Sequence, residues 1–290
     1  MIVRMKQRTT SRNKQLQHIV DFLVLNGTLI ECPGLIHGKI GIAIFFFHYA
    51  QHTCNELFED YAMDIISEIQ MQVHNNSLAN YERGIAGIGV GMDYLLRNQF
   101  LIAEDGLFND FDQRMYRAVM YDPWQDFSLY EGLTGYGRYW MMRFRQSLNK
   151  EQARQCLFHI VGLIYENFSE ISSKDQTDVF IFLHDLHQLS SISICNKLLE
   201  QSRQWYLQSL NDSMGFPRLG DSAMGRISRI YQHSHYFKNN MNIGDLLKKI
   251  LDLDMEKLSV GMGLLTGYAG LGMLHLMEIT PMDMTWLLLY

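Results

Sequence analysis

The sequence predicts an all-α protein, an α/α barrel (toroid) built from about six helical hairpins. Three observations support this prediction. Only 4 of the 290 residues are proline, so few positions are barred from the interior of a helix. A Gly-x-x-Gly motif begins at positions 38, 84, 132 and 267, with intervals of 46, 48 and 135 residues. The long interval is three times the short one, and a period of about 46 residues holds two helices of three to four turns with their loops.

We expect each glycine pair to mark the start of an inner helix. Glycine has no Cβ, so it permits a positive φ in the entering loop and a close approach between neighbouring helices. Two degenerate copies are expected in the long interval. One lies at Ser222-Ala-Met-Gly225 and keeps its second glycine; the other, near Thr177, has lost both.

The hydropathy pattern assigns the helices in order. A first helix is expected around residues 16–25. Residues 42–50 are apolar on nearly every side and predict a buried inner helix. Residues 58–73 carry apolar side chains with a period of 3.6 and predict an amphipathic outer helix. The alternation continues with outer helices expected at residues 108–119 and 152–165 and an inner helix at 136–144.

The predicted inner helices favour a closed barrel. In an open solenoid the inner helices would line an exposed concave face and would be less uniformly apolar. The six hairpins fill the chain, so we expect one domain over residues 1–290.

Composition excludes several functional classes. The chain has 25 Lys and Arg against 31 Asp and Glu, a net charge of −6, which offers no basic field for a nucleic acid. The longest apolar run, residues 40–47, is far short of the roughly 20 residues that span a membrane. Residues 1–17 are polar and basic, without the apolar segment of a secretion signal. We therefore expect a cytoplasmic protein with no membrane span.

The glycine repeats resemble those of the lanthionine synthetase C-like family, the cyclases of lantibiotic biosynthesis and their relatives. The most specific stretch is residues 263–277 (GLLTGYAGLGMLHLM), which is similar to the closing repeat of that family. Residues 34–43 and 84–89 look like earlier repeats. The resemblance implies an α/α toroid. In active members it also implies a zinc site that activates peptide cysteine thiols for addition to dehydroalanine or dehydrobutyrine, closing a thioether ring.

The zinc ligands that the resemblance implies are missing from the aligned positions. The family's Cys-His-Gly motif aligns with residues 220–222, which read Gly-Asp-Ser here. The family's second cysteine belongs to the repeat near Thr177, which contains none. Because catalytic zinc needs three protein ligands and an open position, we expect no zinc and no other cofactor. The four cysteines lie far apart in the sequence and show no metal-binding spacing.

Candidate site residues come from equivalent positions of the repeats. The residue directly before each first-glycine position should lie at one mouth of the barrel, where these side chains would converge on a cavity. We interpret His37, Glu131 and Asp221 as candidate catalytic residues, with His37 and either carboxylate forming a general acid-base pair. Arg83 and Thr266 are candidate substrate-binding residues, and Arg83 could hold a carboxylate. The alternative is that each of these loop residues caps its helix or contacts water.

Two other kinds of chemistry, and a structural explanation of the methionines, are weighed against this. His184 with His187, and His233 with His235, could bind zinc in a way that the family does not use. Glu131 and Asp221 could act as the carboxylate pair of a glycoside hydrolase, with Trp124 and Trp140 as the few aromatic residues for sugar stacking. The 18 methionines are better explained as core filling.

The sequence therefore predicts a lanthionine synthetase C-like protein of a peptide-modification pathway. It would be a pseudoenzyme without zinc that binds a precursor peptide or a modification enzyme as an accessory module. The alternative is an active enzyme, either a thioether-forming cyclase with an atypical metal site or an acid-base catalyst at the barrel mouth. Whether catalysis remains is left open.

Overall fold

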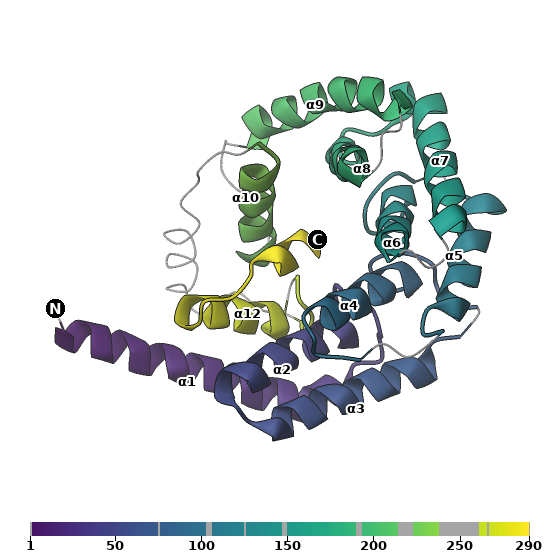
Figure 1. The fold of residues 1–290 in the computed structure, drawn as a ribbon. Helices are drawn as coiled ribbons and strands as arrows, with labels where there is room; N and C mark the ends of the chain where they lie inside the picture. Colours follow the sequence, from purple (N-terminus) through teal and green to yellow (C-terminus); the bar gives the residue numbers. More distant parts are fainter. Residues whose placement is uncertain are drawn as a thin grey trace. The chain divides into compact units, whose positions relative to one another are not determined.

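The computed structural model describes residues 2–74, 76–102, 106–124, 126–146, 150–189, 193–213, 223–237, 261–265 and 267–289. Within these ranges the chain forms eleven α-helices and no strand, so the all-α prediction is confirmed. One isolated bridge pairs Gly261 with Gly267. The chain divides into two compact units, Met1–Gln72 with Asp221–Tyr290, and Val73–Gly220. Figure 1 shows the helices in chain order.

The first unit combines the two ends of the chain. Helix α12 packs against both α1 and α2, although these segments lie far apart in the sequence (Figure 1). Helix α2 also packs on α3, and a C-terminal 3-10 helix packs on α10. The elements are α1 (Ile2–Asn26), α2 (Lys39–Thr53), α3 (Glu56–Gln72), α10 (Ala223–Phe237) and α12 (Tyr268–Ile279), with 3-10 helices at Gly27–Leu29 and Thr285–Leu289.

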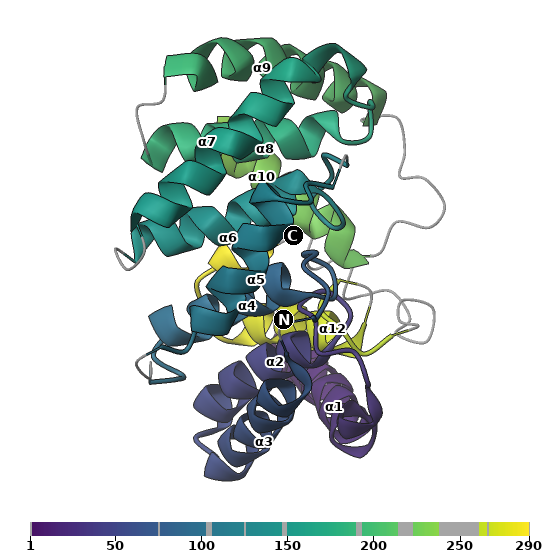
Figure 2. The same cartoon turned by 90° about the vertical axis from the view of Figure 1, so that its right-hand side faces the viewer.

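The second unit is a two-layered set of hairpins. Helices α4, α6 and α8 pack in series in one layer, and α5, α7 and α9 pack in series in the other (Figure 1). Figure 2 views these helices from the side of α5 and α7. The predicted inner helices of this unit are thus neighbours, and so are the predicted outer ones. The elements are α4 (Ile85–Arg97), α5 (Asn109–Met120), α6 (Leu133–Arg145), α7 (Lys150–Glu166), α8 (Gln176–Leu189) and α9 (Ser193–Ser213), with a 3-10 helix at Phe168–Glu170.

Burial confirms the distinction between inner and outer helices. Every residue from Ile40 to Phe47 of α2 is buried, as its apolar sequence requires. Helix α3 buries only one face, formed by Ala62, Ile65, Ile66 and Ile69, and leaves its acidic face exposed. Burial of such a face supplies about 25 cal/mol per Å² of apolar surface. Tertiary packing of this kind, more than helix propensity, stabilises these helices.

The first glycine of each motif precedes an inner helix, as predicted, but one of the two reasons given for it is wrong. The φ angles of the four glycines run from −139° to −106°, so none needs the left-handed region. A Cβ would instead lie 2.2 to 2.6 Å from the carbonyl oxygen six residues earlier. That carbonyl accepts a hydrogen bond from the N–H directly after the glycine, as in Ile85 N–H to Leu78 O at 2.8 Å. The glycine therefore allows a tight loop.

The inner helices do approach closely, but at a glycine outside the Gly-x-x-Gly pair for which the close approach was predicted. Five residues after the first glycine, a further glycine lies against an aromatic ring of the neighbouring inner helix. An added Cβ would lie 2.3 to 2.6 Å from a ring carbon. The pairs are Gly89 of α4 with Tyr139 of α6, Gly137 of α6 with Phe182 of α8, and Gly272 of α12 with Phe45 of α2.

The two degenerate repeats also form helices where they were expected. Helix α8 begins at Gln176, close to the predicted position, and its Phe182 ring fills the gap at Gly137. Helix α10 begins at Ala223, within the predicted copy. At α8 a side chain takes the place of a loop carbonyl. The Asp178 Oδ2 accepts the Leu129 N–H at 2.7 Å, whereas the equivalent Tyr81 N–H donates to the Tyr130 carbonyl. The helical repeat thus persists where the glycines do not.

The first unit contains a buried histidine, and its lowered pKa should make the free energy of unfolding depend on pH. The His275 side chain on α12 is 2% exposed, and neither ring nitrogen has a hydrogen-bond partner among the described residues. Burial, with the Arg12 guanidinium adding to it, lowers the pKa of His275 to about 4. Burial also lowers the pKa of His48 to about 4, although Asp283 opposes the shift. Both imidazoles are therefore neutral in the folded protein near neutral pH.

We predict that His275→Leu reduces acid destabilisation. Unfolding restores an ordinary histidine pKa near 6.5, so the stability due to neutral His275 is present above pH 6.5 and is lost as the pH falls towards 4. The full effect is roughly 3 kcal/mol. Urea unfolding at several pH values should show a shallower decline for His275→Leu than for wild type. His187→Leu, at an exposed position on α8, should match wild type; equal slopes for all three proteins would contradict the prediction.

Candidate functional site

The structure places two of the five predicted mouth residues on adjoining loops. Arg83 and Glu131 both belong to the second unit, and His37 belongs to the first. Asp221 and Thr266 lie outside the described residues. Because these residues are divided between two units, the convergence of all five side chains stays a prediction.

Backbone hydrogen bonds hold the loops of Arg83 and Glu131 together. The N–H groups of Tyr81 and Glu82 both donate to the Tyr130 carbonyl, at 2.9 and 3.0 Å. Because Glu82 and Tyr130 directly precede Arg83 and Glu131, this pairing fixes the two predicted residues on neighbouring loops. Their proximity follows from the repeat, since both loops enter neighbouring inner helices, α4 and α6.

Glu131 is the central acidic group of this loop pair. Its Oε2 accepts a hydrogen bond from the Asn80 Nδ2 at 2.6 Å, and the Asn80 Oδ1 accepts the Arg83 N–H at 3.2 Å. Asn80 is buried, whereas Glu131 itself is exposed. Partial desolvation raises the pKa of Glu131; the Asn80 hydrogen bond opposes the shift, and the Glu82 carboxyl adds to it. The arrangement suits an anionic group that can also take up a proton.

Further acidic groups act on the buried Tyr136 side chain. Burial is the main cause that raises the pKa of the Tyr136 hydroxyl, and the carboxylates of Glu131, Asp122 and Asp126 raise it further. Arg114 acts in the opposite direction, and its Nε donates to the Ser77 carbonyl at 3.0 Å. These charged groups therefore act together on the Tyr136 hydroxyl.

A second polar cluster, missed in the sequence, lies between the loops and α8. Arg138 on α6 forms a hydrogen bond with the fully buried Tyr81 and lies 5.9 Å from the centre of its ring. Burial raises the pKa of Asp178 to about 6, while the Leu129 N–H and Arg138 lower it. Burial also raises the pKa of Tyr130. Asp178 was missed because it follows no glycine motif. The only signal in the sequence was the loss of the glycines in this repeat, which indicates that another group makes the loop contact.

His37 occupies the loop of the first unit that is equivalent to those of Arg83 and Glu131. Its side chain is half-buried. A Cβ at Gly263 would lie 2.5 Å from the His37 Cα, so the closing repeat approaches this loop closely. The N–H groups of Leu264 and Leu265 donate to the Ile36 carbonyl at 3.0 and 3.3 Å. Glycine at position 263 thus makes room for the loop of His37.

The residues weighed for other chemistries are mostly separate from this site. The His184 Nδ1 lies 3.6 Å from the Asp185 Oδ1. The side chains of His187 and His235 are exposed, and the His233 side chain is outside the described part. In that part no three His, Cys, Asp or Glu side chains could hold one metal ion. Trp140 is fully buried and cannot stack on a sugar, whereas Trp124 is exposed. The core-filling interpretation is confirmed for the buried methionines Met141, Met142 and Met273.

Comparisons with known proteins add no identity. No protein-family model matches the sequence, and no curated protein matches it either. Among the described helices, none is both long enough and apolar enough to cross a membrane. The repeats and the residues at their loops are therefore the features that point to a function.

Proposed function

We propose that this protein is a lanthionine synthetase C-like α/α toroid that binds a peptide or partner enzyme as a zinc-free accessory module. The proposed site is the loop end of the repeats, centred on Glu131. The observation that carries it is the joint placement of Arg83 and Glu131 beside Asn80 and Glu82. An exposed mixed-charge cluster anchored by a buried amide is suited to orienting polar groups of a ligand.

Ring closure is supported by a junction that occurs twice. In the second unit, two consecutive N–H groups of one repeat, those of Tyr81 and Glu82, donate to the Tyr130 carbonyl of the next. In the first unit, the last repeat makes the same pair of bonds to the first repeat, at Ile36. A closed ring requires its last repeat to contact its first in the way that neighbours along the chain contact each other. The contacts between glycines and aromatic rings of the inner helices follow the same pattern, since each glycine lies against a ring of the next repeat and Gly272 of the last repeat lies against Phe45 of the first.

The zinc-dependent alternative has no complete ligand set to support it. The described residues offer no group of three candidate ligands, and residues 220–222, which align with the family's Cys-His-Gly motif, are outside the described part. The sequence there still reads Gly-Asp-Ser. Neither glycine nor aspartate is the soft thiolate or imidazole that the cyclase site needs.

An acid-base enzyme is the second candidate, and one observation favours it. The pKa of Glu131 is raised by partial desolvation and by Glu82, and carboxyl groups tuned in this way serve as general acids or bases. Under this alternative His37 and Asp221 would complete the site. Loss of turnover with retained binding in Glu131→Gln would distinguish catalysis from binding alone.

The test combines metal analysis with a cyclisation assay on tag-free protein. We expect no bound zinc after purification in zinc-containing buffer. A fluorescent peptide that contains cysteine and dehydroalanine should bind, and mass spectrometry with thiol labelling should detect no enzyme-dependent thioether. One zinc per chain together with thioether formation would contradict the proposal. Failure of every tested peptide and candidate enzyme to bind would also contradict it.

A further inference from the structure

The loops before α4 and α6 expose large apolar side chains. Leu78 is 61%, Tyr121 76% and Trp124 60% exposed. Scattered exposed apolar residues are common and need no explanation. These three, however, belong to two loops that the Tyr81 and Glu82 hydrogen bonds to Tyr130 hold side by side.

Carboxylates share the same loops. Asp122 and Asp126 flank Trp124 in the sequence, and Glu131 follows in the same loop. The Asp126 Oδ1 lies 2.6 Å from the position of a Cβ added at Gly132, the residue directly after Glu131. All three carboxylates also raise the pKa of the Tyr136 hydroxyl. We call this set, formed by Leu78, Tyr121, Asp122, Trp124, Asp126 and Glu131, the acidic apolar surface.

Carboxylates outnumber the nearby cations at this surface. The Arg114 Nε donates to the Ser77 carbonyl, beside Leu78. The Arg83 Nε lies 3.4 Å from Glu82, and the Arg83 charge also lowers the pKa of Glu131. Glu82 and the three carboxylates of the surface therefore stand against the two guanidiniums of Arg83 and Arg114. Exposed aromatic rings beside carboxylates complement a cation on an aliphatic stem, which can pair with the carboxylate and lie over the ring.

We propose that the acidic apolar surface binds a basic peptide segment in which lysine or arginine alternates with apolar residues. This inference deepens the proposed function and rests on it, because it assigns a chemical class to the peptide. Charge complementarity selects this partner, since an acidic surface repels the phosphates of nucleic acids and anionic membranes. The aromatic and aliphatic side chains supply the apolar part of the interface.

The experiment uses the full chain and two labelled synthetic peptides with identical leucine and phenylalanine positions. One carries lysine and arginine at the remaining positions, and the other carries glutamate. Fluorescence anisotropy should show at least about tenfold tighter binding of the basic peptide, weakening between about 50 and 300 mM salt. Trp124→Ala and Glu131→Gln should each lower its affinity by about fivefold or more.

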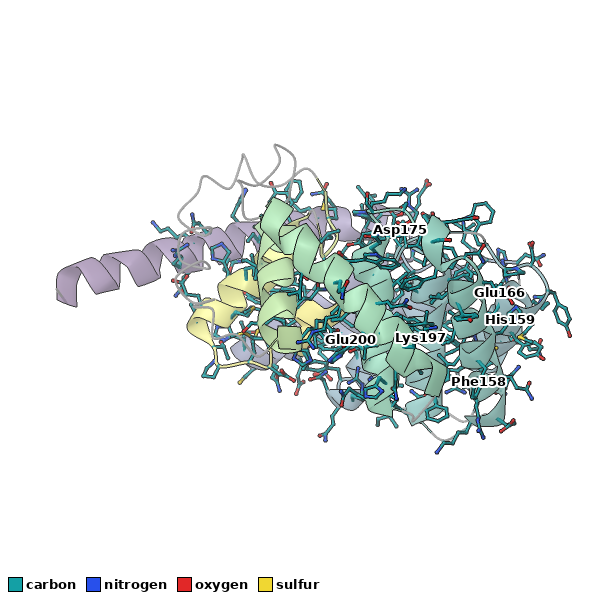
Figure 3. The ribbon with its side chains drawn as sticks, turned by 90° about the horizontal axis from the view of Figure 1, so that it is seen from above. Phe158, His159, Glu166, Asp175, Lys197 and Glu200 are labelled. Atoms are coloured by element: carbon teal, nitrogen blue, oxygen red, sulfur yellow. The ribbon has the colours of Figure 1, made fainter. Side chains whose placement is uncertain are left out.

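Matched controls lie on α7. Phe158→Ala removes another exposed aromatic side chain, and Glu151→Gln removes another exposed carboxylate. Figure 3 labels Phe158 on this helix, and it lies in the same unit as the acidic apolar surface. Neither control should change the affinity for the basic peptide. Because all four positions are exposed, loss of folding should not confound the comparison, and circular dichroism would verify this.

Several outcomes would overturn the inference. Equal binding of the acidic and basic peptides, or equal effects of the surface and control variants, would show that this surface is not the site. Self-association that Glu131→Gln abolishes would assign the surface to a second copy of the chain. Binding of a neutral or acidic peptide elsewhere would overturn this inference and leave the proposed function standing. Binding of no peptide of any charge would remove peptide binding altogether.

Discussion

Arg143→Met is expected to lower the free energy of unfolding by about 3 to 5 kcal/mol, because it leaves a buried carboxylate without its guanidinium. The Arg143 Nε and Nη2 donate to the two oxygens of Asp112, each at 2.8 Å. The Tyr139 hydroxyl donates to the same carboxylate at 2.6 Å. Both charged side chains are less than 5% exposed, so water cannot replace the lost bonds.

Two comparison variants make this prediction specific. Arg97→Met removes a guanidinium that is 56% exposed and pairs with Asp93 one turn away, so its loss should be about 1 kcal/mol or less. Arg143→Met combined with Asp112→Asn should be more stable than Arg143→Met alone, since the uncompensated charge is gone while an acceptor for Tyr139 remains. Urea unfolding measures all three. Equal losses at the two arginines would show that burial of the pair is unimportant.

The same network should make one cysteine unreactive. Cys156 on α7 is buried, and burial together with the Asp112 carboxylate raises the pKa of its thiol to about 12. A thiol with so high a pKa holds almost no thiolate, the form that binds metal or attacks an electrophile. Among the described cysteines this applies to Cys156 alone, since Cys32 is half-buried and Cys54 is exposed.

The helical repeat could be predicted because it depends on local patterns. Burial on every side of α2 and on one face of α3 follows directly from their sequences, and the glycine pairs mark the helix starts. The reason for the first glycine was only partly predicted. Its backbone is unstrained, and what excludes a Cβ is the loop carbonyl six residues earlier. A sequence does not show that contact until the loop geometry is known.

The candidate site was only half predictable for a physical reason. Equivalent positions in a repeat lie on equivalent loops, so Arg83 and Glu131 could be named in advance. Asn80 could not, because its hydrogen bond to Glu131 joins residues 51 positions apart and depends on how two loops pair. Asp178 could not be named either, because its repeat has lost the glycine motif that marks the other loops. Its carboxylate replaces a loop contact there.

Gly137→Ala is expected to destabilise the protein by about 2 to 3 kcal/mol, because the new methyl group overpacks the contact between α6 and α8. Its Cβ would lie 2.3 Å from a ring carbon of Phe182. Alanine otherwise favours a helix over glycine by about 0.5 to 1 kcal/mol. Gly162→Ala on α7 is the matched control, since nothing lies within 4 Å of its added Cβ. It should therefore be neutral or stabilising.

A smaller, ring-free side chain opposite should relieve the overpacking in Gly137→Ala, and the same test applies where the last repeat meets the first. Gly137→Ala combined with Phe182→Leu should lose less stability than the two single changes added together, a coupling that urea unfolding measures. Gly272→Ala with Phe45→Leu should show coupling of the same sign, because the Cβ at Gly272 would also lie 2.3 Å from a ring carbon. Coupling at Gly137 without coupling at Gly272 would mean that the contact between α12 and α2 differs from the contacts between successive repeats. The proposed closed ring would then lose its main support, because a toroid needs that contact to be equivalent to the others.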